Sequence, residues 1–432
     1  MRHRVAGLAC AAIVAAAPVQ AQNMRDQVRQ LFTFGNCGQQ VCLDTAVLFG
    51  HGDHFIPASE TIGSTLISFL STSIGISVSN TPISSASSGT TFRFEGGVPV
   101  KTSTSAGPIF GERAQTLGRG RWFVGFGLTA IQFARLRGVP LNDINLTLPH
   151  QDTNPPGSPT DTLGIPAFEN DVIDVNVHMN VSVLVSALSL SYGLVDGLDV
   201  GVTVPFVRTA VSGRSTAQIV LVGGDTLHHF AGSTGANPLL TSTSAVDASA
   251  FGLGDVEGRL KINVAQSERI GVALLGYARF PTGDAQNLLG AGRFSGRGLG
   301  VVSARFGDFS PHANFGVTVR DAPELNNSVE ANAGFDALLS PWSTMAVDLL
   351  GSWQVGASKV DVPPPVVYEA PAQHTVNVTN IPSQKDDFLS LALGFKFRTR
   401  GGVQIVTNAL FPLRDSGLQP TVMWTGGVEY TF

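Results

Sequence analysis

Residues 254–264 read GDVEGRLKINV, and their polar and apolar side chains alternate along the stretch. The charged side chains fall on the odd positions, namely Asp255, Glu257, Arg259 and Lys261. Successive side chains of a β-strand point to opposite faces, whereas a helix would spread these charges around its whole circumference. The stretch therefore predicts a strand with one charged face and one apolar face.

The same alternation recurs in other parts of the chain, at residues 173–191, 311–320 and 388–398. In the second of these, Phe315 and Val317 alternate with Asn314 and Thr318. A soluble β-sandwich alternates in the same way. Alternation thus predicts an all-β fold but does not by itself choose between a sandwich and a barrel.

The lengths of the connections make that choice. Strands are expected at 121–136, 172–193, 198–212, 254–265, 269–281, 298–306, 311–320, 327–339, 343–356, 386–398, 402–412 and 421–432. Every second link is short, as at 195–197, 266–268 and 340–342, and the links between them are longer, as at 137–171, 213–253 and 357–385. Short turns at one end and long loops at the other are typical of outer-membrane barrels. The sequence predicts a transmembrane, antiparallel, up-and-down β-barrel.

The pattern allows two strand numbers. Residues 65–79 and 90–100 also resemble strands, and counting them gives the preferred number of fourteen. In the alternative, a barrel of twelve strands holds these residues as a plug. We therefore expect the barrel to occupy residues 65–432, preceded by a periplasmic or luminal segment at 22–64.

Composition and the first residues indicate an exported protein. Charged residues make up 14% of the 432 residues, against about 25% in an ordinary soluble domain. The formal charge of -5 argues against a nucleic-acid partner. Arg2 and Arg4, an apolar run at 5–17 and Val19-Gln20-Ala21 predict a signal peptide at 1–21. After Gln22 no run has the roughly 20 apolar residues of a membrane helix.

The last residues are similar to the C-terminal assembly signal of bacterial outer-membrane proteins. The positions that carry the resemblance are Thr425, Gly427, Tyr430 and Phe432. The resemblance implies two partners, the barrel-assembly machinery and outer-membrane lipid. Trp122 and Trp342 lie near strand ends, where interfacial aromatic residues are common.

Cys37 and Cys42 are the two cysteines that remain after cleavage. A pair in an oxidising compartment predicts a disulfide. His51 and His54 follow them, so a zinc site is the alternative, although the spacing matches no standard zinc finger.

The charged residues of the strands are candidates for lining the lumen, because a charge on the lipid side is costly. They are Asp255, Glu257, Arg259, Lys261, Arg279, Arg305, His312, Arg320, Glu330, Asp336, Asp348, Lys396, Arg398 and Glu429. Two interpretations remain open, a salt-bridge network that fills a narrow barrel and a polar conduit. The sequence contains neither G-x-S-x-G nor H-E-x-x-H, so an enzyme is the weakest hypothesis and no cofactor is expected.

Two motifs resemble a known family. GLGDVEGRLK at 252–261 and PTGD at 281–284 are similar to the MetA-pathway phenol-degradation outer-membrane family, over roughly residues 120–432. That family is related in kind to the long-chain fatty-acid transporters. The resemblance implies diffusion of aromatic or other hydrophobic compounds across the outer membrane. We expect a monomeric barrel that lets a small hydrophobic or aromatic solute enter passively. The N-terminal Asn-Pro-Ala motif of the fatty-acid transporters is missing here.

Apolar residues of the long loops would contact such a solute first, or would pack among themselves. They are Leu239, Leu240, Phe251, Leu288, Leu289, Phe294, Val362, Val366 and Tyr368. The alternative to a transporter is a structural or adhesive surface barrel with a sealed lumen.

Overall fold

The computed structural model describes most of the chain. The described residues are 23–44 without 36, 38 and 39; 55; 61–74 without 62, 66 and 69; 92–95; 98–101; 105–150; 171–222; 226–322; 325–359; 362; 364–368; and 372–432. The expected signal peptide lies outside them. Within the described residues, no helix is both long and apolar enough to cross a membrane.

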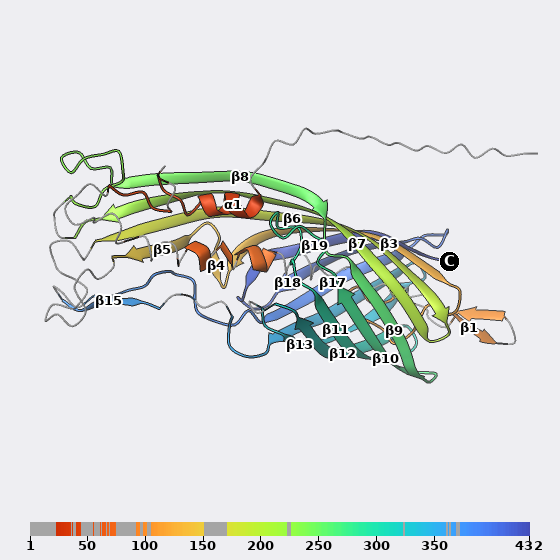
Figure 1. Ribbon diagram of the computed structural model, residues 1–432. Helices are drawn as coiled ribbons and strands as arrows, with labels where there is room; N and C mark the ends of the chain where they lie inside the picture. The colour runs from red at the N-terminus through yellow and green to blue at the C-terminus, as the bar shows by residue number, and fades with distance from the viewer. Residues whose placement is uncertain are drawn as a thin grey trace, which may run out of the picture.

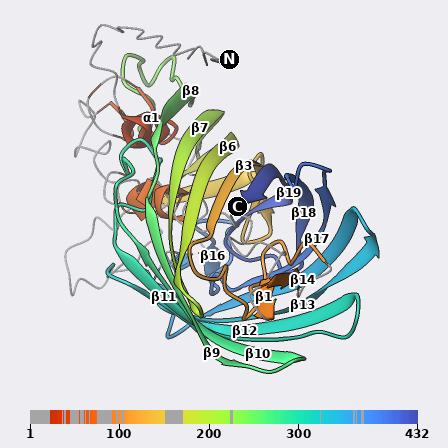
Figure 2. The same ribbon diagram turned by 90° about the vertical axis from the view of Figure 1, so that its right-hand side faces the viewer.

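Twelve antiparallel strands form a closed ring (Figures 1 and 2). They are β3 (Trp122–Leu136), β6 (Val172–Val195), β7 (Leu198–Val220), β9 (Glu257–Gln266), β10 (Ile270–Arg279), β11 (Ser295–Ala304), β12 (Phe309–Arg320), β13 (Ser328–Ser340), β14 (Ser343–Gln354), β17 (Phe388–Arg398), β18 (Gln404–Pro412) and β19 (Leu418–Thr431). Strand β3 closes the ring by pairing with β19 on one side and β6 on the other. The predicted all-β antiparallel barrel is confirmed, and each of the twelve expected strands is present.

The preferred count of fourteen strands is wrong. The described residues between 61 and 74 are helical, and β1 (Phe92–Glu95) and β2 (Val98–Lys101) form a separate two-stranded sheet. Within the described residues, the closed ring begins with Trp122 of β3. Ile67, Leu70 and Ile74 are buried, and their spacing of three and four residues is that of one helix face. These buried apolar residues therefore follow the period of a helix and not that of a strand.

The two faces of the wall differ in polarity. On β12, Phe315 and Val317 are exposed on the outside, at 64% and 48%, whereas His312 and Asn314 are buried inside. Trp122 and Trp342 are exposed at strand ends, as expected for residues at a membrane interface. An apolar exterior around a polar interior is the arrangement of a barrel in lipid.

The short links all lie at one end of the barrel, here called the turn end, and the long links lie at the other, the loop end. Asp196 and Gly197 form the turn between β6 and β7, where Gly197 has a φ of 86°. A hairpin turn of two residues needs such positive φ values, which glycine adopts without strain. The chain terminus at Phe432 also lies at the turn end, where its backbone pairs with Trp122.

The wall is much taller on one side. Strands β6 and β7 have 24 and 23 residues, and β8 (Thr241–Leu253) pairs with the upper part of β7 above β9. Short strands β4 (Val139–Pro140) and β5 (Ile144–Pro149) pair with β3 and β6. Figure 1 shows these strands extending far beyond the rest at the loop end. Residues 213–220 and 241–253, expected in a long loop, are thus part of the wall.

The N-terminal elements cover the inner face of this extension. Helix α1 (Met24–Gln30) lies against β8, and its Met24 and Val28 are buried. They join one apolar cluster with Val175 and Val177 of β6. A small sheet of β15 (Val366–Tyr368) and β16 (His374–Val376) lies at the same end.

Candidate functional site

Residues 105–117, called the luminal segment from here on, run inside the barrel just before β3 begins. The segment forms neither helix nor strand, and Ala106, Glu112 and Ala114 are buried. Buried backbone N–H groups need hydrogen-bond acceptors. Inward-pointing wall side chains provide them: Thr344 accepts from Ala106 N at 2.8 Å, Asn314 from Glu112 N at 2.9 Å, Ser303 from Ala114 N at 3.0 Å and Asp199 from Leu117 N at 2.9 Å.

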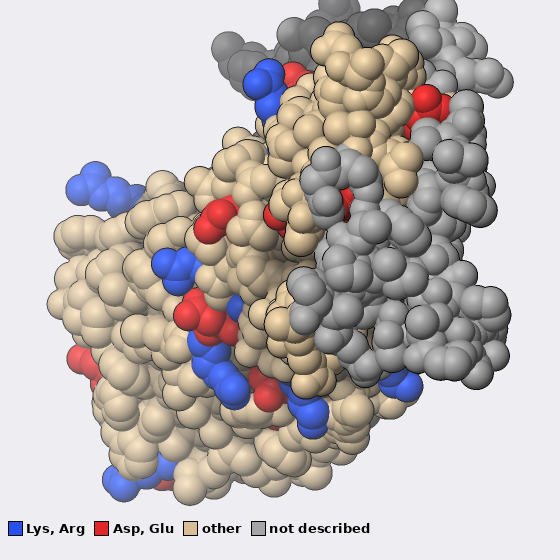
Figure 3. All heavy atoms as spheres, turned by 90° about the vertical axis from the view of Figure 1, so that its left-hand side faces the viewer, with Lys and Arg blue, Asp and Glu red and all other residues tan. Residues whose placement is uncertain are grey.

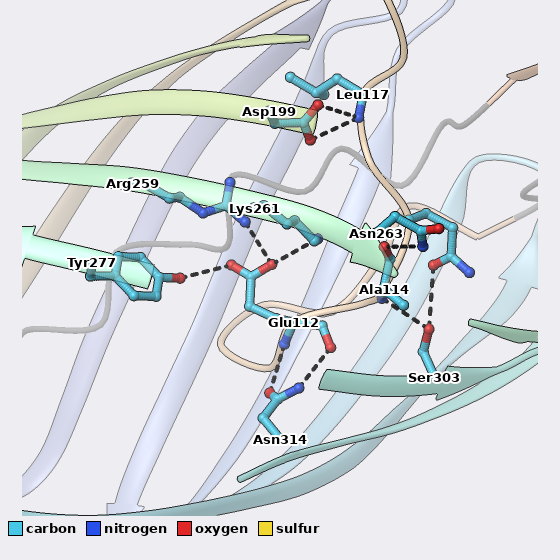
Figure 4. Close-up of polar contacts among 11 residues, drawn as sticks. Glu112, Ala114, Leu117, Asp199, Arg259, Lys261, Asn263, Tyr277, Ser303 and Asn314 are labelled. Carbon is cyan, nitrogen blue, oxygen red and sulfur yellow. Dashed lines mark hydrogen bonds and ion pairs between the residues drawn. The ribbon is translucent and has the colours of Figure 1, made fainter. Parts of the chain in front are cut away.

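Glu112 is the centre of a buried polar cluster (Figure 4). Its Oε2 accepts hydrogen bonds from Arg259 Nη2 at 2.8 Å and Lys261 Nζ at 3.3 Å, both on β9. Its Oε1 accepts from the Tyr277 hydroxyl on β10 at 3.1 Å. Side-chain exposure is 5% for Glu112, 9% for Arg259 and 1% for Lys261. Buried charges of this kind are tolerated because they are paired.

The neighbouring Arg113 binds a different part of the wall. Its Nε donates to Asp336 Oδ1 on β13 at 3.0 Å, and its Nη2 contacts Asp336 Oδ2 and the Ser105 hydroxyl. Consecutive side chains of an extended chain point in opposite directions. Glu112 and Arg113 can therefore attach the luminal segment to two regions of the wall at once.

A second group of charges lies closer to the loop end, on β9 to β13. Arg279 Nη2 and Glu257 Oε2, which are partners in the strand register, form an ion pair at 2.6 Å. Arg297 lies 4.0 Å above the ring of Tyr277, in a cation–π contact. Glu330 receives a hydrogen bond from Thr318.

Further buried pairs connect strands that lie two apart in the ring. His312 Nε2 lies 2.6 Å from Asp348 Oδ1, and Lys396 Nζ lies 3.1 Å from Glu429 Oε2. All four residues are on the list of lumen candidates from the sequence. In these positions they occupy the interior with paired charges.

The remaining candidates lie at the two ends. Arg320 donates from Nη1 to the Asn326 carbonyl at 2.7 Å, near the loop end. Arg305 and Arg398 are half-buried at the turn end. These three residues take no part in the cluster around Glu112.

Asp255 anchors a loop that folds into the barrel. Its carboxylate accepts from Gly283 N at 3.0 Å and Ala291 N at 2.7 Å. Leu288 and Leu289 of the same loop are thereby buried in the apolar cluster. The GLGD and PTGD motifs thus have a structural role, because the first holds the loop that the second begins.

The interior towards the loop end is apolar. The cluster there combines α1, the loop at 281–292 and the inner faces of β5 to β8. Of the apolar loop residues, Leu288, Leu289 and Tyr368 are buried, Leu240, Val362 and Val366 pack partly against the cluster, and Leu239, Phe251 and Phe294 are exposed. Figure 3 views the molecule from this end and shows charges of both signs scattered among uncharged residues.

Cys37 and Cys42 form a disulfide with Cα atoms 5.6 Å apart. The Cys42 carbonyl accepts from Ala231 N at 2.9 Å, so this part of the chain is fixed to the loop after β7. His51 and His54 lie outside the described residues. In the described part of the chain no three metal-binding side chains come together.

The histidines of the loop after β7 are buried rather than solvated. His228 Nδ1 lies 2.7 Å from Asp171 Oδ2, and His229 Nε2 lies 3.8 Å from Asp44 Oδ2. The Ser233 hydroxyl lies 3.0 Å from His229 Nδ1, but it also bonds the Phe230 carbonyl and Leu239 N. Ser233 therefore holds the loop together, as serine commonly does in turns.

The C-terminal residues complete the ring. Thr425 is buried and its hydroxyl lies 3.0 Å from that of Thr129 on β3. Gly427 pairs in register with Gly127, while Tyr430 and Phe432 are exposed on the outside. These are the four positions of the expected assembly signal.

Sequence reasoning missed Glu112, Arg113, Tyr277 and Arg297. The first two lie in a stretch with no strand period, and no partner for them can be read from local sequence. One signal was present, since residues 102–112 contain a single charge, Glu112, which Arg113 directly follows.

Comparisons with known proteins were made by sequence and by structure. No protein-family model matches the sequence, and no curated protein matches it. Among solved structures, the chain is similar to an outer-membrane channel from Pseudomonas putida F1 at 12% identity and a TM-score of 0.39, covering 74% of this chain and 98% of that one. It is also similar to a FadL homologue from Pseudomonas aeruginosa, at 10% identity and a TM-score of 0.30, covering 72% and 88%. A third is the toluene transporter TbuX from Ralstonia pickettii, at 12% identity and a TM-score of 0.27, covering 73% of this chain and 89% of that one. These values establish no family, so the proposals below rest on the residues of this chain.

Proposed function

We propose that this protein is an outer-membrane channel for the passive uptake of small hydrophobic or aromatic compounds, in which the luminal segment closes the lumen between passages. The apolar exterior of the barrel supports a site in lipid. The residues of the expected assembly signal lie on or next to β19, the last strand, which pairs with β3. This position supports a location in the outer membrane in particular.

One observation carries this proposal: the interior changes from apolar to charged along the barrel axis. Towards the loop end it is apolar and includes Val175, Leu288 and Leu289. Further down, charged pairs and the luminal segment fill it. Apolar surfaces with a few polar groups are typical of sites for small organic molecules, whereas a pore for ions has a polar lining throughout.

The luminal segment has the properties of a removable closure. It is not part of the sheet; polar side chains from β7, β11, β12 and β14 hold its backbone, and Asp336 of β13 holds the Arg113 side chain. Breaking these contacts would leave every strand pairing of the wall intact. Movement of the segment is therefore compatible with a stable barrel.

The same pairs favour a second function, a structural or adhesive barrel with a sealed lumen. In that case Glu112 and Arg113 would serve stability alone. The two functions differ in one measurable respect, because a sealed barrel passes no solute.

Vesicles with an outer leaflet of lipopolysaccharide provide the test, since this leaflet slows apolar solutes that cross phospholipid alone. We expect labelled phenol to enter vesicles that contain the protein faster than it enters empty vesicles. Equal rates would support the sealed barrel and contradict the channel.

A further inference from the structure

The contacts of Glu112 describe a binding site for a carboxylate. Three side chains of the wall, Arg259, Lys261 and Tyr277, donate to its two oxygens. Charge-assisted hydrogen bonds from arginine and lysine are the usual means of binding a carboxylate. All three donors belong to the rigid sheet, whereas the carboxylate belongs to the luminal segment.

The site offers more donors than Glu112 uses. Arg259 Nε is buried and, within the described chain, has no hydrogen-bond partner. Lys261 is almost fully buried, and its ammonium group has three donors. A buried donor without an acceptor is costly, so a surplus of donors indicates a site that accepts another ligand.

The surrounding charges favour an anion. Arg279, Arg297 and Arg320 lie on the loop-end side of the site, and Glu257 and Glu330 are the acids among them. Asp199 is the register partner of Lys261 on β7, and both of its oxygens accept from Leu117 N. When Glu112 leaves, the site loses one negative charge, and the surroundings of Arg259 and Lys261 become more cationic.

We propose that Arg259, Lys261 and Tyr277 bind the carboxylate of a small organic acid, and that Glu112 occupies this site when the lumen is closed. The proposal rests on the proposed function, because the acid must reach the site through the lumen. A carboxylate on an apolar body fits both parts of the interior, the apolar cluster first and the charged site below it. Its arrival displaces Glu112 and so breaks one of the two charged side-chain contacts, those of Glu112 and Arg113, that attach the luminal segment to the wall.

Removal of Glu112 should expose the site to a free acid. We compare purified wild-type protein with the variant Glu112→Ala by isothermal titration calorimetry, using benzoate, octanoate and the neutral analogue benzyl alcohol. Arg113→Ala is the matched control, since it loosens the luminal segment but keeps the Glu112 carboxylate as a competitor for the site. Benzoate and octanoate distinguish an aromatic from an aliphatic acid.

We expect Glu112→Ala to bind benzoate or octanoate at least about tenfold more tightly than wild type, with no gain for benzyl alcohol and a smaller gain for Arg113→Ala, in which Glu112 still competes for the site. Adding Arg259→Gln to Glu112→Ala should remove the gain, which locates the ligand. Equal affinity of wild type and Glu112→Ala for both acids would overturn the proposal.

Two precautions keep this test decisive. If Glu112→Ala does not fold, as judged by heat-modifiable gel mobility, Glu112→Gln keeps the shape of the side chain and the same gain is expected. Phenol influx into the vesicles described above is measured on the same preparations. Phenol influx without any acid binding contradicts the carboxylate site alone, whereas no influx at all contradicts the channel itself.

Discussion

Glu112 and Arg113 are consecutive residues, yet they bind the barrel wall at places four strands apart. Glu112 contacts Arg259 on β9 at 2.8 Å, and Arg113 donates to Asp336 on β13 at 3.0 Å. The two residues carry opposite charges, and each finds the opposite charge on the wall. This arrangement fixes both the position and the direction of the luminal segment inside the barrel.

Loss of one of these attachments should open the lumen. We predict that Arg113→Ala increases the open probability of channels in planar bilayers, and with it the mean conductance, by about tenfold or more, because each ~1.4 kcal/mol lost from the closed state raises the ratio of open to closed channels tenfold. Removing one partner of a buried ion pair costs about 3–5 kcal/mol, so the effect should be easy to detect.

Glu268→Gln is a suitable control for conductance, since Glu268 is an exposed acid in the turn between β9 and β10. It should leave the conductance at the wild-type level. An Arg113→Ala channel that conducts like wild type would show that the luminal segment does not close the lumen.

The pair Lys396 and Glu429 should contribute to stability rather than to closure. Both are almost fully buried, and they join strands β17 and β19 across β18. We predict that Glu429→Gln lowers the free energy of unfolding by about 3–5 kcal/mol, because the lysine charge stays buried without its partner.

The double variant Lys396→Met with Glu429→Met should regain most of this loss, since no buried charge remains. Urea-induced unfolding in lipid vesicles, followed by tryptophan fluorescence, measures both variants. A double variant no more stable than Glu429→Gln would contradict this explanation.

The wall of the barrel was predictable because its physical cause is local. A strand at 254–264 shows its two faces in its own sequence. Because every wall strand has lipid on one side and polar groups on the other, the same alternation recurs along the chain. The tall extension was harder to recognise. Residues 241–253 have small polar and apolar side chains on both faces, so their alternation is weak.

The contents of the barrel were not predictable in the same way. Segments such as 105–117 have no period, and their partners lie about 80 to 240 residues away in the sequence. The helical residues between 61 and 74 resemble a strand in the sequence, because a short apolar run suits both a strand and a helix. Only the closed ring shows that the first wall strand is β3.

Asp255 should control the loop at 281–292. We predict that Asp255→Asn lowers the free energy of unfolding by about 1–3 kcal/mol. In the wild type both carboxylate oxygens accept from backbone N–H groups, whereas the asparagine amide would place its own N–H donor against one of them. Hydrogen exchange of the Gly283 and Ala291 amides should become faster.

Asp321→Asn, which changes an exposed acid, should leave these two amides unchanged. Slow exchange at Gly283 and Ala291 in Asp255→Asn would mean that other contacts hold the loop.

The disulfide between Cys37 and Cys42 closes a short loop, and its removal should have a local effect. We predict that replacing both cysteines by serine costs about 2 kcal/mol in the N-terminal segment, from the entropy of so short a loop. Limited proteolysis should become faster near Leu43, which bridges to Phe230. The heat-modifiable mobility of the barrel should stay, and its loss would show that the segment supports the wall.

The central claim is that solute passes through the lumen that residues 105–117 fill. An ideal Cβ on Gly271 would lie 2.9 Å from the Ala114 Cβ, and a disulfide needs about 3.5–4.5 Å, so a shift of about 1 Å permits a bond. The variant Ala114→Cys with Gly271→Cys should therefore lock the luminal segment to β10. Phenol influx into lipopolysaccharide-containing vesicles is then measured before and after reduction, with wild type treated in the same way. We predict influx at the rate of empty vesicles in the oxidised variant and recovery to the wild-type rate after reduction. The same influx in both states would contradict the claim.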